Sequence, residues 1–196
     1  DGLSGTWNKA NITMSGTARM DNLTLKSGAC YLTCSGVAEI AGVSSIYSDK
    51  VQLSMSGVTS ISMDNIYSGL ANVTAGGASR LKSLEFNARE LIADLSGTSS
   101  VKFVGKIDKI SAEMQGASSL SLNGNGNEVT VSASGTSTLN AKNFTVKDAS
   151  LKLSGVAGAT VTVTEKLETE TSGSSHIDYY GNPKTVSNKS NNVVKH

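Results

Sequence analysis

Two tyrosines stand in matching motifs, Ser45-Ile46-Tyr47-Ser48 and Asn65-Ile66-Tyr67-Ser68, at a spacing of 20 residues. An exposed tyrosine ring combines an apolar body with a polar tip and is suited to contact with sugar rings. If the two isoleucines point inward, alternation along a strand turns both tyrosines outward. Tyr47 and Tyr67 are therefore the candidate ligand-binding residues. The alternative is an aromatic pair across two strands that merely stabilises a sheet.

Side chains that could catalyse a reaction are sparse and scattered. Hydrolysis of a glycosidic bond needs two carboxylates at a defined separation, but Asp21 and Asp64 lie two repeats apart with no acidic residue between them in register. Neither His176 nor His196 has a serine or cysteine partner at a recognisable spacing. Four further acids lie near the third corner of their repeats and are interpreted as solvated surface residues: Asp49, Glu90, Asp148 and Glu168. We therefore predict no catalytic residues and a protein that is not an enzyme.

The two cysteines, Cys30 and Cys34, are four positions apart. In an extended strand their Cα atoms would be about 13 Å apart, beyond disulfide reach, although a turn at Gly28–Cys30 would change that. We favour two buried thiols, with a disulfide and a metal or redox role as alternatives. No histidine or further cysteine stands nearby to complete a metal site, and no helix follows Gly124 and Gly126 to form a nucleotide loop. No metal and no cofactor are expected.

The composition narrows the classes of partner. The net charge is +1 and only 17% of the residues are charged, so nucleic acid is not an expected partner. The chain has no run of 18 apolar residues, so no membrane-spanning segment is expected. No signal peptide is visible at Asp1. Low charge with many small polar residues is nevertheless common in surface-exposed β proteins, and we expect an extracytoplasmic protein whose signal peptide has been removed.

A glycine returns about every 20 residues, which is the signature of a repeat architecture. The recurring positions are Gly16, Gly36, Gly57, Gly77, Gly97, Gly116, Gly135, Gly155 and Gly173. The residue two positions after each of them is small, as expected at a tight corner where backbones approach closely.

Three apolar columns accompany the glycines. Four positions before them stand Ile12, Leu32, Leu53, Val73, Ala93, Ala112, Val131, Leu151 and Thr169. Two positions before them stand Met14, Cys34, Met55, Ala75, Leu95, Met114, Ala133, Leu153 and Thr171. Four positions after them stand Met20, Ile40, Ile61, Leu81, Val101, Leu120, Leu139, Ala159 and Ile177. Apolar and polar residues alternate with a period of two, which predicts strands with one buried face.

Two looser apolar columns follow further from the glycine. The first consists of Leu25, Ile46, Ile66, Phe86, Ile107 and Phe144, and the second of Leu70, Ile110, Val129 and Val186. In register with the tyrosines, Lys26 and Asn87 would extend their row. The segments 105–110 and 123–127 are expected to form locally distorted corners, because glycines interrupt the pattern there.

Twenty residues are too few for a four-stranded propeller blade but fit one coil of a parallel β-helix. The chain has no Leu-x-x-Leu-x-Leu pattern of leucine-rich repeats and no hexapeptide repeat of left-handed acyltransferases. We predict an all-β, single-stranded parallel β-helix of about nine coils, right-handed because parallel crossovers usually are. Residues 1–196 would form one domain, with residues 1–10, including Trp7, as the N-terminal cap and residues 182–196 as a C-terminal cap or tail.

The repeated corners, such as Ser96-Gly97-Thr98-Ser99-Ser100 and Ser134-Gly135-Thr136-Ser137, are accompanied by the ending Ser172-Gly173-Ser174-Ser175-His176-Ile177-Asp178-Tyr179-Tyr180-Gly181-Asn182-Pro183. Together they resemble the putative auto-transporter adhesin "head GIN" family of bacterial extracytoplasmic proteins, common in Bacteroidetes. The resemblance covers nearly the whole chain. It implies a pectin-lyase-like β-helix without known catalytic residues and a role in adhesion, and it carries over no binding residues.

Three functions are compatible with these features. The favoured one is a non-enzymatic adhesion or structural module at the cell surface or secreted, which binds through an extended face of the β-helix. The first alternative is a carbohydrate-binding or carbohydrate-active β-helix of the cell envelope, and the second is a self-assembling scaffold. The partner would be a host or bacterial surface protein or a glycan, and self-association is compatible with the open edges of a solenoid.

Overall fold

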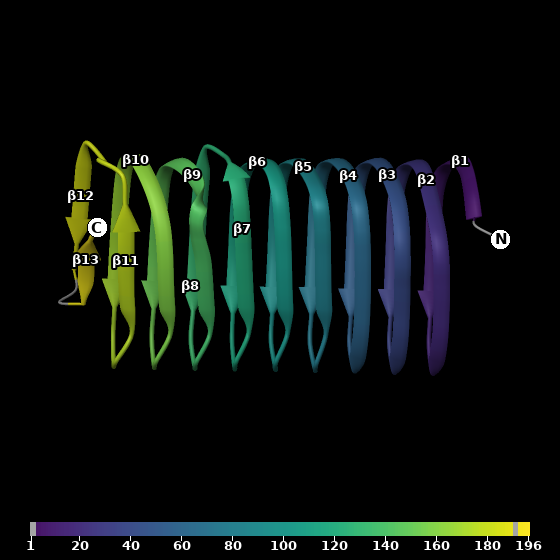
Figure 1. Cartoon of the computed structure of the whole chain (residues 1–196), viewed down its shortest axis with the longest axis horizontal. Coiled ribbons are helices and arrows are strands. Elements are labelled where there is room, and N and C mark those ends of the chain that lie inside the picture. The colour runs from purple at the N-terminus through teal and green to yellow at the C-terminus, as the bar shows by residue number, and fades with distance from the viewer. Residues whose placement is uncertain (1–2, 190–191) are drawn as a thin grey trace.

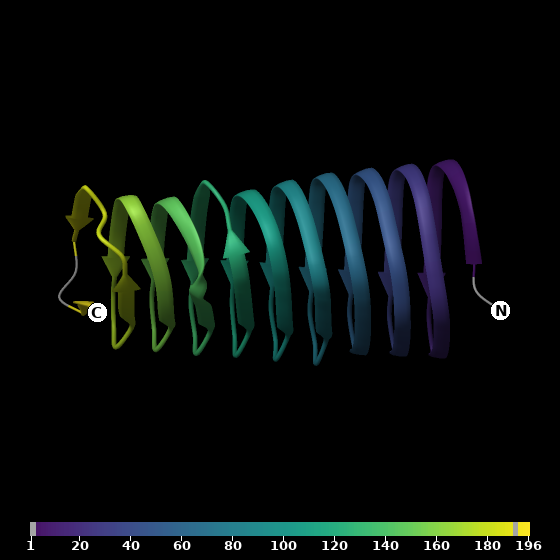
Figure 2. The ribbon, with the colours of Figure 1, turned by 45° about the horizontal axis from the view of Figure 1, so that its top comes forward.

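The computed structural model describes residues 3–189 and 192–196 and forms a parallel β-solenoid of about nine turns. Successive coils lie side by side along one long axis, with the first and last coils at opposite ends (Figure 1; Figure 2). No helix occurs in the part of the chain that the structure describes. The predicted parallel β-helix is therefore confirmed.

Each coil is built from one long strand or from two shorter ones. The strands are β1 (Leu3–Met14), β2 (Thr17–Cys34), β3 (Val37–Met55), β4 (Val58–Ala75), β5 (Arg80–Leu95), β6 (Ser100–Met114), β7 (Ser119–Asn125), β8 (Glu128–Ala133), β9 (Thr138–Leu153), β10 (Gly158–Thr171), β11 (His176–Tyr180), β12 (Thr185–Asn188) and β13 (Val193–Lys195). Every pairing between them is parallel, and β1 to β6 follow one another in order. Consecutive coils therefore stack like residues on like residues.

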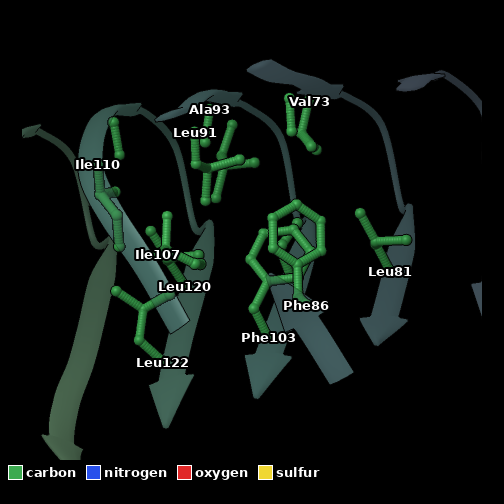
Figure 3. Close-up of a cluster of buried hydrophobic side chains, with 14 of the residues drawn as sticks. Val73, Leu81, Phe86, Leu91, Ala93, Phe103, Ile107, Ile110, Leu120 and Leu122 are labelled. Carbon is green, nitrogen blue, oxygen red and sulfur yellow. The ribbon is translucent and has the colours of Figure 1, made fainter. Parts of the chain in front are cut away.

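The three predicted apolar columns form the centre of the core. From the second coil onward nearly all of their members are buried, for example Leu53, Leu81 and Leu120, which are at most 1% exposed. Figure 3 shows the middle of this core, where side chains from both sides of the coil point toward one another. Because each strand alternates inward and outward residues, the polar residues between the columns lie on the outer surface.

The serine-glycine corners stack as a ladder. At Gly97 the φ angle is +68°, a left-handed conformation that L side chains rarely adopt. The amide of the next residue, Thr98, donates to the carbonyl oxygen of Gly77 at 2.8 Å. A Cβ on Gly97 would stand 2.6 Å from that oxygen. The recurring glycine thus meets two demands at once, the turn and the close approach of the next corner.

The looser columns were predicted correctly in part. Leu25, Ile46, Ile66 and Phe86 stack in one column, but Ile107 pairs with Ala88 and lies two positions further along the coil. The column continues through Gly105, Gly124 and Phe144 instead. The assignment of Ile107 is therefore wrong, because the sheet register shifts between Lys82 and Ala88.

Leu70 was also placed in the wrong column. It pairs with Lys50 and Glu90 and is half-buried, whereas Ala71 occupies the inward position and pairs with Leu91. Leu91 in turn pairs with Ile110. The predicted distorted corners are confirmed, with positive φ at Gly105 and Gly124 and a break between β7 and β8.

The two ends of the solenoid carry aromatic residues. Residues 3–10 lie in β1 and pair with β2, and Trp7 is 37% exposed. At the other end β12 pairs with β10 and β13 pairs with β11, so residues 185–188 and 193–195 of the segment 182–196 are strand. Tyr179 packs against the core, and Tyr180 stacks with His196 at 5.0 Å between ring centroids. Both tyrosines therefore take part in the packing of the C-terminal end.

The cysteines are free and buried. Cys30 pairs with Val51, and Cys34 pairs with Met55, so both fill positions of apolar columns. Burial raises the pKa of the Cys30 thiol to about 11 and also raises the pKa of Cys34. The favoured interpretation of two buried thiols is confirmed.

Candidate binding groove

The predicted tyrosine pair forms on the outer surface. Ile46 and Ile66 are 0% exposed, and the neighbouring Tyr47 and Tyr67 project outward and pair in register. Their ring centroids are 5.0 Å apart and the ring planes differ by 1°. One face of each ring is therefore covered by the other ring. The uncovered face of Tyr47 is directed toward the coil of Lys26, its register partner on the other side.

A groove runs past these rings across the first six coils, from β1 to β6, with a volume of about 860 Å³. We call it the corner groove. Its floor consists of stacked small residues, namely Ser27, Ser48, Ser68 and Ala88. Larger residues stand at the two ends of this floor column: Trp7 pairs with Ser27, and Ile107 pairs with Ala88. The groove exists because four consecutive coils place a small residue at the same corner.

The first wall of the corner groove precedes the floor residues along each strand and contains Lys26, Tyr47, Tyr67, Asn87 and Lys106. The predicted row of Lys26, Tyr47, Tyr67 and Asn87 is confirmed by the strand register. The spacing of the repeat predicts this row but not the groove that it borders.

Tyr67 is held in place by an acidic residue that sequence analysis missed. Its hydroxyl donates to Oε1 of Glu85 at 2.6 Å, and the side-chain amide of Asn87 donates to the same oxygen at 2.9 Å. The hydrogen bond to Glu85 raises the pKa of the Tyr67 phenol above its ordinary value. Tyr67 is thus a fixed part of the wall, while Tyr47 is 47% exposed.

The second wall follows the floor residues along each strand and contains Gly28, Asp49, Gly69, Arg89 and Asp108. The wall is low at Gly28 and Gly69, because a glycine has no side chain. A Cβ on Gly69 would stand 2.7 Å from Nη2 of Arg89 and 2.8 Å from the carbonyl oxygen of Asp49. Arg89 therefore reaches back over the neighbouring coil, through space that only a glycine leaves open.

Little in the sequence pointed to the second wall. Arg89 is one charged residue among several on the outer surface, and its side chain crosses from its own coil to the preceding one. The serines of the floor were visible at the ends of the two tyrosine motifs, and their spacing of 20 residues could have indicated a column of small residues. Elsewhere on the surface Tyr31 lies between Lys9 and Lys50, with Lys9 Nζ 4.8 Å from the ring centroid.

The groove has none of the clustered ligands of a metal centre. Within residues 3–189 and 192–196, no three His, Cys, Asp or Glu side chains gather as they would around a metal ion. The described residues also contain no helix that is long and apolar enough to cross a membrane. What the groove offers chemically is an aromatic pair, hydroxyl groups and several charges along one line.

Comparison with known proteins agrees with the resemblance seen in the sequence. A family model described as "putative auto-transporter adhesin, head GIN domain" matches residues 66–183, which is more than half of the chain. No curated protein and no solved structure matches the chain. The matched segment begins within β4 and reaches beyond β11, so it spans most of the solenoid. The chain therefore belongs to the family of auto-transporter adhesin-like head GIN domains.

Proposed function

We infer that this protein is a non-enzymatic adhesion module, extracytoplasmic as its family name suggests, and that it binds its partner along the corner groove. The observation that carries this proposal is the corner groove itself, in which the outward pair Tyr47 and Tyr67 borders a hollow of about 860 Å³. Binding sites of proteins are commonly concave and combine aromatic surface with a few placed polar groups. The corner groove has both features.

The form of the groove supports adhesion more than catalysis. Coils of a β-helix stack at about 4.8 Å, so a hollow across six coils suits an extended ligand with many weak contacts. Such contacts add up along a chain and do not require a deep pocket. The rings of Tyr47 and Tyr67 cover each other's facing sides. The outer face of Tyr47 is therefore the surface on which a ring of the ligand can stack.

The experiment is a binding screen of the folded protein against matrix proteins and against host and bacterial glycans. We expect at least one partner whose binding falls about tenfold or more in the Tyr47→Ala/Tyr67→Ala variant. Tyr31→Ala is the matched control, because it removes a tyrosine from another part of the surface. Binding that survives in the double variant would move the site elsewhere, and the absence of any partner would favour the scaffold alternative.

A further inference from the structure

The guanidinium of Arg89 is a cation in the wall of the corner groove. Among the described residues no carboxylate forms an ion pair with it. Its side chain extends over Gly69, opposite the wall that carries Tyr67. A guanidinium has a planar fork of donors that matches the two oxygens of a carboxylate. We propose that the corner groove binds a glycan chain that carries carboxylate groups, and that Arg89 binds one of these carboxylates.

Two of the cations that line the groove form no ion pair within the part of the chain that the structure describes. Lys106 and Asp108 form an ion pair at 3.5 Å and offset each other. Lys26, like Arg89, has no ion pair among the described residues, and Asp49 is the one remaining acid in the two walls. The unpaired charges of the walls are therefore two cations and one anion, although the whole protein has a net charge of only +1.

Glu85 adds a negative charge beside the first wall, and its carboxylate is engaged within that wall. Its Oε1 accepts hydrogen bonds from both Tyr67 and Asn87. The carboxylate thereby fixes two residues of the wall. Both donors are neutral, so its charge remains, and the case for an anionic ligand rests on the unpaired guanidinium of Arg89 across the groove and not on the net charge of the groove. The groove consequently presents fixed donors and an aromatic ring on one side and a free guanidinium on the other.

The dimensions favour a chain of sugars. The coils repeat at about 4.8 Å, which is close to the length that one pyranose adds to an extended polysaccharide. Each coil can therefore face one sugar unit, with hydroxyl-bearing residues such as Ser48 and Ser68 in the floor. The outer face of Tyr47, beside Lys26, is placed to contact the ring of one such unit.

An extended acidic peptide is a poorer match. Peptides that bind to sheets usually gain affinity by pairing with a free strand edge. In the groove, strands β2 to β5 already pair with the coils on both sides, so they offer no free edge. The groove also lacks a row of apolar pockets for alternate side chains, because its floor is made of serines and an alanine.

This inference rests on the proposed function, since it names the ligand class of the same groove. The test uses oligosaccharides of alginate and hyaluronan, each paired with its carboxyl-reduced counterpart, and measures affinity for the whole protein by calorimetry. We expect at least one uronate glycan to bind, and its reduced form to bind roughly tenfold or more weakly. Arg89→Gln should cause a loss of similar size, and added salt should weaken binding.

Arg80→Gln is the matched control, because Arg80 is an exposed arginine of the same strand and lines a different hollow. It should leave the affinity unchanged. Equal binding of native and reduced glycans, full affinity in Arg89→Gln, or no binding of any uronate glycan would each overturn the inference. If a neutral glycan, an acidic peptide or a protein then binds and the Tyr47→Ala/Tyr67→Ala variant loses it, the proposed function stands and only the ligand class is wrong.

Discussion

Gly97 lies directly against Gly77 in the ladder of corners, and a Cβ on Gly97 would stand 2.6 Å from the carbonyl oxygen of Gly77. The same is true along the ladder, for example at Gly57 above Gly36. Gly16 differs, since it has a φ of +70° but nothing within 4 Å of its added Cβ. Two corners with the same backbone conformation therefore differ in crowding alone.

We expect Gly97→Ala to destabilise the fold by roughly 2–4 kcal/mol, because it combines backbone strain with a clash against backbone. Gly16→Ala should cost only about 1 kcal/mol, since an L residue at positive φ is strained but meets no neighbour. Urea unfolding followed by circular dichroism compares the two variants. Equal losses of stability would contradict the explanation by close approach.

The stacked tyrosines predict a measurable coupling. In a double-mutant cycle with Tyr47→Ala and Tyr67→Ala, we expect a coupling free energy of roughly 0.5–1.5 kcal/mol in unfolding, as for other stacked aromatic pairs. The same measurement establishes whether the variants used for binding remain folded. A coupling near zero would mean that the rings do not stack in solution.

The tyrosine pair was predictable because it depends only on the repeat. A spacing of 20 residues stacks Tyr47 on Tyr67, and the inward isoleucines fix the direction of both rings. The three inner columns were predictable for the same reason. A parallel solenoid repeats one coil, so the sequence period and the strand register carry the same information.

What the period could not predict involves side chains that leave their own column. Tyr67 donates to Glu85, which is two positions out of register, since Glu85 pairs with Asn65 and Tyr67 pairs with Asn87. Arg89 occupies the space above Gly69 in the preceding coil. These contacts depend on the conformations of the side chains. The repeat pattern shows which residue types stack on one another, but it carries no information about those conformations. Ile107 was misplaced because the repeat between Gly97 and Gly116 is 19 residues long and the missing residue could lie anywhere in the coil.

The bond between Tyr67 and Glu85 predicts a pH dependence. The pKa of the Tyr67 phenol is raised in the folded state above the ordinary value of 10.0. The stability that this bond contributes is therefore fully present below about pH 10 and is lost as the pH rises through the higher pKa of the folded state. The stability difference between the protein and Tyr67→Phe should shrink only in that alkaline range.

The direct measurement is the phenolate absorbance during an alkaline titration, taken as the difference between the protein and Tyr67→Phe. Glu85→Gln should bring the titration of Tyr67 back toward its ordinary pKa, because the hydrogen bond to the carboxylate is the main cause of the shift. A difference titration that Glu85→Gln leaves unchanged would argue against the bond in solution.

The buried cysteines should be unreactive in the folded protein. The Cys30 thiol has a pKa of about 11 because of burial, so little thiolate is present near pH 8 and the reagent has no access. A chromogenic disulfide reagent should therefore detect two thiols per chain after denaturation and almost none before it. No thiols after denaturation would indicate a disulfide, and rapid reaction of the folded protein would contradict the burial of both residues.

The side chains that fill the core change between the coil of Phe86 and the coil of Phe103. Phe86 ends the stack of large side chains Leu25, Ile46 and Ile66, and the residue that lies against its backbone in the next coil is a glycine, Gly105. Phe103 on β6 packs its ring 4.2 Å from that of Phe86, and the two rings are tilted by 34° (Figure 3). Both are at most 1% exposed.

Because the ring of Phe103 packs against Phe86 and the next residue in the column is a glycine, truncation of Phe86 leaves a cavity beside Phe103. We expect Phe86→Ala to destabilise the protein by roughly 3–5 kcal/mol. Leu84→Ala, in the same strand but at a residue 54% exposed, should stay within about 0.5 kcal/mol. Chemical unfolding of the two variants measures both values. A loss of unfolding free energy in Phe86→Ala as small as that in Leu84→Ala would contradict this expectation. It would mean that neighbouring side chains move into the cavity, for which Gly105 in the next coil leaves room.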